Sequence, residues 1–222
     1  MKNMAVKSFL SKVVTAALLA SVLAACAPVM FGGAVVSGLV AVDRRTSGSQ
    51  LEDETIELKG AIALRENLGD RAHVNITSYN RRVLLTGEVS NAQDRQLVEK
   101  VVSSLPNVKA ITNELAVMGS TSLTARSKDA YLTGRVKASL IDAKDLFATA
   151  FKVVTERGTV YLMGRVTQRE ADRATDIARA TSGVSKVVRV FEYINEDELK
   201  ALLPEPAPKA DAKSDAKAPA AK

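Results

Sequence analysis

The feature that most constrains this sequence is an internal repeat. Residues 73–87 are matched by residues 150–164, at an offset of 150 − 73 = 77 residues. The segments before and after them match at an offset of 76, as Asp53 does with Asp129. Self-similarity at one fixed spacing is the signature of a duplicated structural unit. The chain is therefore expected to fold as two copies of one small unit of roughly 65–70 residues.

The residue pattern of each copy predicts five elements in the order helix, strand, strand, helix, strand. In the second copy Leu132, Val136 and Leu140 recur every four residues, which is the apolar stripe of a helix. The dipeptides at 80–81 and 157–158 separate two short strand-like runs and suit tight hairpin turns. The expected fold class is α+β, with two helices on one face of a three-stranded sheet in each copy. The last strands are expected at 108–117 and 184–194, and the two units are expected to dock.

Glycines mark the hairpins of both copies. Gly158 lies in the second turn, where a positive φ is required. Gly87 and Gly164 end the second strand of each copy, where a backbone can approach closely.

Capping signals precede the second helix of each copy. Ser90-x-x-Gln93 and Thr167-x-x-Glu170 have the spacing of a capping box. The carboxylates at 52–54 and at 170–172 are interpreted as charges near helix starts, where the helix dipole favours them.

The first 25 residues read as a secretory signal, with Lys2, Lys7 and Lys12 before a short apolar run. The run is too short to cross a membrane. Leu-Ala-Ala-Cys26 resembles the bacterial lipobox, so Cys26 is expected to be acylated and to become the mature N-terminus. Because Ala27 rather than Asp follows, sorting to the outer membrane, facing the periplasm, is expected. Several acyl chains would anchor the chain stably.

Residues 27–42 are apolar but interrupted by glycines. They read as a tether lying on or near the bilayer, and a second inserted element is the alternative. Residues 43–50 read as a polar linker. The resulting boundaries are a signal peptide at 1–25, a lipidated terminus and linker at 26–50, units at 51–119 and 127–195, and a disordered Lys/Ala/Pro tail at 204–222.

Composition excludes several function classes. The chain has one cysteine and one histidine, so a Cys/His zinc site is excluded by counting ligands. Catalysis by a nucleophile and histidine would have to use His73, which reads as a strand residue at the surface. No cofactor motif is present, and an enzyme is not expected. The net charge of +6 comes largely from the signal and tail, so nucleic-acid binding is not expected either.

A lipobox followed by two αββαβ units, each with a V-x-L-x-G second strand, resembles the BON (bacterial OsmY and nodulation) domain family, and within it the dual-BON outer-membrane lipoproteins. The resemblance implies no enzymatic activity. It implies binding of anionic phospholipid through the second domain, a location at the outer membrane and division site, and a role in envelope integrity.

The residues themselves also nominate the first helix of the second copy. Residues 50–65 carry a net charge of 2 − 4 = −2, whereas the equivalent residues 126–141 carry 4 − 1 = +3. An aromatic residue among cations suits a helix lying on anionic lipid. The expected lipid-contact residues are Lys128, Tyr131, Leu132, Gly134, Arg135, Lys137 and Ala138. A solvated helix with ordinary surface charge is the alternative.

A protein adaptor is the competing function. Its expected surface is either the small sheets or the acidic first helix of the first copy (Glu52–Glu66), including Glu54 and Glu57. Its partner would be an envelope protein such as an outer-membrane assembly or cell-wall remodelling factor. The oligomeric state is left open.

Overall fold

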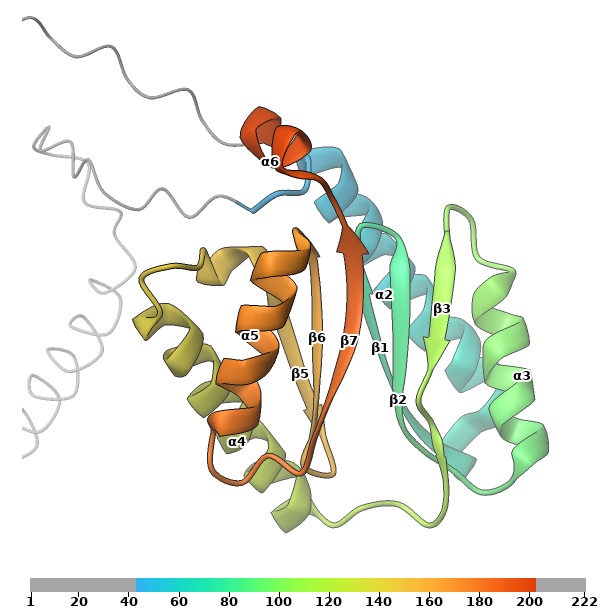
Figure 1. Cartoon of the computed structure of the whole chain (residues 1–222). Helices are drawn as coiled ribbons and strands as arrows, with labels where there is room; N and C mark the ends of the chain where they lie inside the picture. Colours follow the sequence, from blue (N-terminus) through green and yellow to red (C-terminus); the bar gives the residue numbers. More distant parts are fainter. Residues whose placement is uncertain (1–42, 203–222) are drawn as a thin grey trace, which may run out of the picture. The chain divides into compact units, whose positions relative to one another are not determined.

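The computed structural model describes residues 43–202 (Figure 1). Cys26, the signal, the 27–42 segment and the tail lie outside the described residues. Within them the chain forms two αββαβ units in succession, as the repeat predicts. The expected α+β fold is confirmed.

The first unit follows the predicted order of elements. They are α2 (Ser47–Leu68), the short helix η1 (Gly69–Arg71), β1 (Ala72–Tyr79), β2 (Arg82–Val89), α3 (Ala92–Ser103), β3 (Ala110–Asn113) and β4 (Ala116–Val117). The last strand, expected to be continuous, is broken into β3 and β4. The Asn113 side chain accepts a hydrogen bond from the Leu115 amide at 3.2 Å, and Leu115 turns into the core.

The second unit repeats this order without the break. Its elements are α4 (Leu123–Asp142), η2 (Ala148–Ala150), β5 (Lys152–Glu156), β6 (Thr159–Val166), α5 (Gln168–Ala180) and β7 (Lys186–Tyr193), and α6 (Glu196–Leu202) follows.

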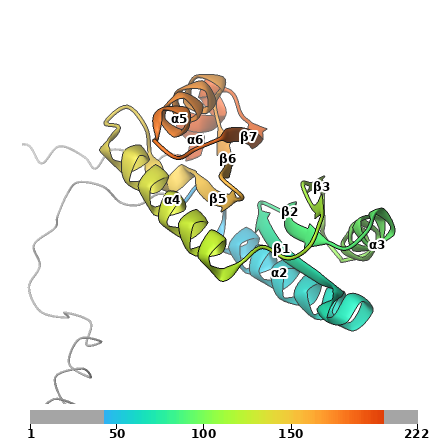
Figure 2. The ribbon, with the colours of Figure 1, turned by 90° about the horizontal axis from the view of Figure 1, so that it is seen from below.

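The two sheets share one topology. The second strand lies in the middle, antiparallel to the first strand and parallel to the third, in the orders β1-β2-β3 and β5-β6-β7. The two helices of each unit cover one face of its sheet (Figures 1 and 2). Each helix–sheet layer encloses a hydrophobic core.

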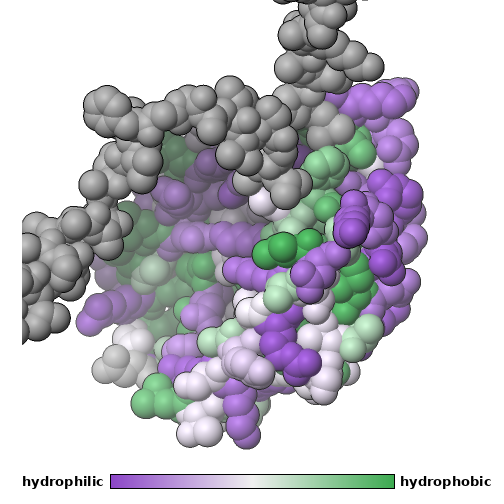
Figure 3. Space-filling model, turned by 90° about the vertical axis from the view of Figure 1, so that its left-hand side faces the viewer, coloured by the Kyte–Doolittle hydropathy of each residue, from purple (hydrophilic) through white to green (hydrophobic). Residues whose placement is uncertain are grey.

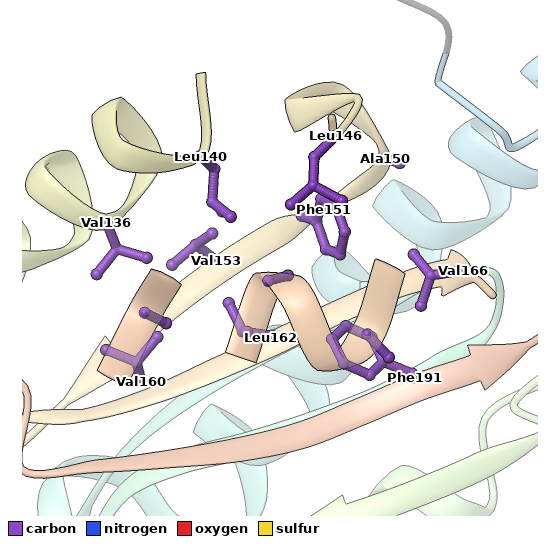
Figure 4. Close-up of a cluster of buried hydrophobic side chains, with 13 residues drawn as sticks. Val136, Leu140, Leu146, Ala150, Phe151, Val153, Val160, Leu162, Val166 and Phe191 are labelled. Atoms are coloured by element: carbon purple, nitrogen blue, oxygen red, sulfur yellow. The ribbon is translucent and has the colours of Figure 1, made fainter. Parts of the chain in front are cut away.

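In the second unit Val136 and Leu140 of α4 point toward Val153 of β5, while Phe151 meets Phe191 edge to face (Figure 4).

The hairpin turns are held by one aspartate in each unit. Asn80 and Arg81 have φ of 50° and 67°, and the equivalent turn in the second unit also has positive φ. Asp53 accepts hydrogen bonds from both turn amides at 2.7 Å, and Asp129 does the same in the second hairpin at 2.8 Å. Interpreting Asp53 as a helix-dipole charge was therefore wrong: it lies in the second turn of α2, is buried, and fixes the hairpin.

Gly158 occupies its turn with φ of 70°. Gly87 has φ of 111°, and a Cβ there would collide with the carbonyl oxygen of His73. A Cβ on Gly164 would collide with the carbonyl oxygen of Ala150. Both glycines therefore let the second strand pass close to the neighbouring backbone.

The caps of the second helices differ. Thr167 and Glu170 form the predicted capping box. In the first unit the box expected at Ser90 and Gln93 is wrong by one residue, because Asn91 caps α3 by accepting from the Asp94 amide at 2.8 Å.

The segment expected to be a polar linker is structured. Thr46 caps α2, which begins at Ser47. Arg44 is only 2% exposed and reaches the second unit, where its guanidinium meets Glu170 at 2.6 and 2.8 Å. Arg45 binds Asp53 at 2.8 Å and stacks over the Tyr79 ring at 4.5 Å. These contacts bury Arg44 and half-bury Arg45, whereas composition alone would place both arginines in solvent.

The sheet faces turned away from the helices also carry apolar residues. Tyr79 and Leu84 of the first sheet join Tyr161 and Met163 of the second in one buried cluster. Lys152 and Glu57 pair at 2.8 Å, and Asn75 donates to Glu156 at 3.1 Å. The described residues 43–202 accordingly form one compact unit that contains both cores.

Candidate functional site

Helix α4 presents most of the expected contact residues to solvent. Lys128, Gly134, Arg135, Lys137 and Ala138 are exposed. Tyr131 is 71% exposed, although aromatic side chains are commonly more buried than this.

Leu132 is the exception among the expected residues. It is 7% exposed and belongs to the buried stripe of α4 with Val136 and Leu140. Leu132 therefore does not belong to the exposed face of α4, although it lines the groove beside that helix.

Two further residues extend the exposed face. Leu123 is 79% and Ile141 is 69% exposed, at the two ends of α4. They are 141 − 123 = 18 residues apart, which is five turns of an α-helix, so they lie on the same side of it. Small residues, including Gly134 and Ala138, occupy the stretch between them. Sequence reasoning missed both ends, although the 18-residue spacing is visible in the sequence.

The cations border this apolar strip. Lys128 and Arg135 follow one edge, since they lie three residues before and four residues after Tyr131, and Lys137 lies on the opposite edge. Arg135 donates to the Ser182 carbonyl at 2.8 Å, which holds its guanidinium beside the loop after α5. Figure 3 shows the side of the molecule that carries α4 and α5, with apolar patches separated by polar and charged side chains.

A groove of about 430 Å³ lies beside α4. Its lining includes Lys128, Tyr131 and Arg135 of α4, Arg157 of the hairpin turn, and Gly183. Arg157 is neutralised by Glu88 at 3.0 Å. Asp129 also lines the groove, where its carboxylate accepts from the Arg157 and Gly158 amides, so Lys128 and Arg135 together outweigh one negative charge there.

Glu88 is a buried anion with several donors. Burial alone raises its pKa, but hydrogen bonds from Thr121 and Arg157, with the Arg157 charge, outweigh it, so the pKa of Glu88 lies below its ordinary value. The carboxylate therefore stays ionised and holds the hairpin of the second unit against the first.

His73, the histidine of the described residues, has Glu88 as its charged neighbour. It lies in β1, half-buried, with Nδ1 at 3.6 Å from Glu88. Among residues 43–202 no cluster of three His, Cys, Asp or Glu side chains suits a metal ion. In the same range no helix has the length and apolarity needed to span a bilayer.

With this geometry in place, the chain can be assigned to a family. The profile of the BON domain matches residues 53–119 and 128–195. The protein belongs to the BON domain family and carries two copies of the domain.

Individual relatives agree with this assignment. Outer membrane lipoprotein DolP of Haemophilus influenzae is 40% identical over 172 residues, covering 77% of this chain and 89% of the relative. The 21 kDa hemolysin of Actinobacillus pleuropneumoniae is 32% identical and covers 69% and 80%. The osmotically-inducible protein Y of Escherichia coli is 27% identical and covers 63% and 72%.

Proposed function

We propose that this protein is an outer-membrane lipoprotein, anchored through Cys26 and facing the periplasm, that binds anionic phospholipid through its second BON domain and supports envelope integrity, acting at the division site. The similarity to an outer membrane lipoprotein supports the location. The surface of α4 supports the lipid contact, and no catalytic step is part of the proposal.

The observation that carries the lipid contact is the exposed strip of α4. Leu123, Tyr131 and Ile141 are large apolar side chains on one side of a helix, with cations along both edges. A helix of this kind lies in the membrane interface, with its apolar side in the acyl boundary and its cations at the phosphates. Each cation near an anionic surface contributes about 1 kcal/mol, and salt screens this attraction.

Gly134 and Ala138 shape the middle of the strip. A Cβ placed on Gly134 would meet no atom within 4 Å, so the helix surface there is open. Small side chains keep the strip flat enough for the cations on either edge to reach the same layer of headgroups.

The test is sedimentation of residues 41–222 with vesicles of zwitterionic lipid and with vesicles containing anionic phosphatidylglycerol, at two salt concentrations. Binding is expected only to the anionic vesicles and is expected to weaken with salt. Losing two cations costs about 2 kcal/mol, roughly 30-fold in affinity, so Arg135→Glu with Lys137→Glu should weaken binding by at least that factor.

A matched control exists on the equivalent helix of the first domain. Lys59 and Arg65 are exposed on α2, and reversing them changes the net charge equally. Equal loss of binding in both double variants would show a response to net charge rather than contact through α4. Unchanged binding in the α4 variant would refute the proposal.

A protein adaptor remains the second candidate, and α2 favours it. Leu51, Leu58 and Ile62 are exposed on that helix, at 67%, 64% and 51%. Glu57, expected to be part of this surface, instead pairs with Lys152 and accepts from the Ser78 amide at 2.7 Å. Leu58→Ser is expected to abolish cross-linking to an envelope protein if the adaptor function holds, without changing vesicle binding.

A further inference from the structure

The second BON domain has a small apolar groove at the end of its contact helix. The groove has a volume of about 130 Å³ and lies between the last turns of α4, η2 and the start of β5. Leu140, Phe151 and Val153 form its floor, and all three are buried. Figure 4 shows Leu140 and Val153 between α4 and β5, with Phe151 beside Leu146 near η2.

The mouth of the groove opens onto the α4 strip. Ile141 lines the groove and also forms one end of the strip, so the two surfaces are continuous. Lys137 lines the groove and is exposed, which places an ammonium group at the entrance. Phe147, at 43% exposure, adds a further exposed apolar side chain in the same connection between α4 and η2.

The first domain supplies an internal comparison. A groove of about 260 Å³ occupies the same position, between the end of α2 and the start of β1. At the repeat offset of 76 residues, Arg65 of the first domain corresponds to Ile141 of the second. Ala61 of the first domain corresponds to Lys137 of the second. The groove of the first domain also contains His73. The repeat therefore preserves the groove and a cation beside it, but only the second copy has a large exposed apolar side chain, Ile141, in the groove lining.

We infer that this groove takes part of one acyl chain of an anionic phospholipid whose phosphate lies at Lys137. An apolar floor favours methylene groups over water, and the adjacent cation favours a phosphate over a neutral headgroup. At about 30 Å³ for a water-sized group, the groove holds roughly four methylene groups. It would therefore accept one segment of one chain and leave the other chain in the bilayer.

This inference rests on the proposed function and specifies how the lipid is held. A helix that only lies on the surface is indifferent to chain length below the headgroup. A groove that contains a chain gains affinity with each buried methylene group, about fourfold per group from about 0.8 kcal/mol.

The first experiment uses residues 41–222, which include the compact unit of residues 43–202 and lack Cys26, so the protein's own acyl chains cannot compete. The probes are glycerol phosphate and the dibutyryl and dihexanoyl forms of phosphatidylglycerol, each kept below its micelle concentration, with affinity measured by titration. Dihexanoyl lipid is expected to bind about 15-fold more tightly than dibutyryl lipid, since two more methylene groups are buried.

Blocking variants separate the groove from the charged strip. Ala148 lines the groove, and Ala148→Phe is expected to fill it and remove the dependence on chain length. Ala72→Phe at the equivalent groove of the first domain is the matched control and should leave that dependence intact. The melting temperature of each variant shows that loss of binding is not loss of folding. Affinity that does not change with chain length, or that is unchanged in Ala148→Phe, overturns the inference.

A second experiment uses the full lipidated chain in vesicles containing phosphatidylglycerol with a photoreactive group within one acyl chain. Cross-links are expected on Leu140 or Phe151 and are expected to disappear in Ala148→Phe, while those on Tyr131 persist. Cross-links confined to the strip would overturn the groove and retain the proposed function. Absence of vesicle binding, with chain-length dependence still present in solution, would instead refute the membrane contact alone.

Discussion

The ion pair between Arg44 and Glu170 allows a quantitative test of how the segment before α2 is attached. Both side chains are only 1% exposed, and the Arg44 guanidinium donates two hydrogen bonds of 2.6 and 2.8 Å to the Glu170 carboxylate. Arg44 also donates to the Arg165 carbonyl at 2.9 Å. Arg44→Ala removes all three interactions and leaves a buried carboxylate.

Breaking a buried pair by removing one partner costs about 3–5 kcal/mol. The lower end applies here, because the Thr167 amide still donates to Glu170 at 3.0 Å. A loss of about 3 kcal/mol corresponds to a melting temperature lower by roughly 6–12 °C for a folded body of this size. Thermal and urea unfolding of residues 41–222 would measure it.

The control is Arg189→Ala, which removes an exposed pair with Asp172 and should cost less than about 1 kcal/mol. In Arg44→Ala combined with Glu170→Gln, the loss should be smaller than the sum of the single losses, because no charge is left buried. An Arg44→Ala variant as stable as Arg189→Ala would refute the reasoning.

The same pair predicts a dependence on pH. Burial raises the pKa of Glu170, but the hydrogen bonds from Arg44 and Thr167 outweigh it and leave the pKa below its ordinary value. The stabilisation is therefore present above the pKa of an unfolded glutamate and is lost as the pH falls through the lowered value. The difference between wild type and Arg44→Ala should accordingly shrink in acid.

Two further substitutions test the packing of the strands. Gly87→Ala would place a Cβ against the His73 carbonyl at a residue with positive φ. The free energy of unfolding in urea is therefore expected to fall by about 3 kcal/mol. A decrease below about 1 kcal/mol would show that the strand can move aside. Burial raises the pKa of Glu156, the hydrogen bond from Asn75 opposes this, and the charge of Glu88 adds to it. The wild-type protein therefore loses stability as the pH rises through that pKa. The melting temperature of Glu156→Gln should accordingly rise relative to that of the wild type between pH 4 and pH 7.5. A difference in melting temperature that stays constant over this range would contradict the prediction.

Features set by neighbouring residues could be predicted from the sequence. The helix stripe of α4 and the positive-φ hairpins depend on spacings of a few residues, and the repeat showed each of them twice. The capping box at Ser90 failed because the neighbouring Asn91 and Asp94 have the same spacing, and pattern alone does not decide between two overlapping caps.

Features set by long-range pairing could not be predicted. Arg44 and Glu170 are 126 residues apart, and an arginine in a polar segment carries no local sign of its partner. The buried role of Asp53 was also hidden, because it lies among other carboxylates. For the candidate site, the cations and Tyr131 followed from charge comparison, whereas the groove depends on how α4, η2 and β5 meet in space.

The apolar cluster that joins the two sheets affects how the duplicated halves can diverge. Tyr79 and Leu84 come from one copy, and Tyr161 and Met163 from the other. An ancestral single copy would have exposed this sheet face to water, or covered it with another identical chain. After duplication, the volume left for a side chain of one copy depends on the residues of the other copy. At these positions, a larger side chain in one copy is expected to be tolerated when the facing side chain of the other copy becomes smaller. The two copies therefore evolve together in this cluster, while their outer helices remain free to specialise.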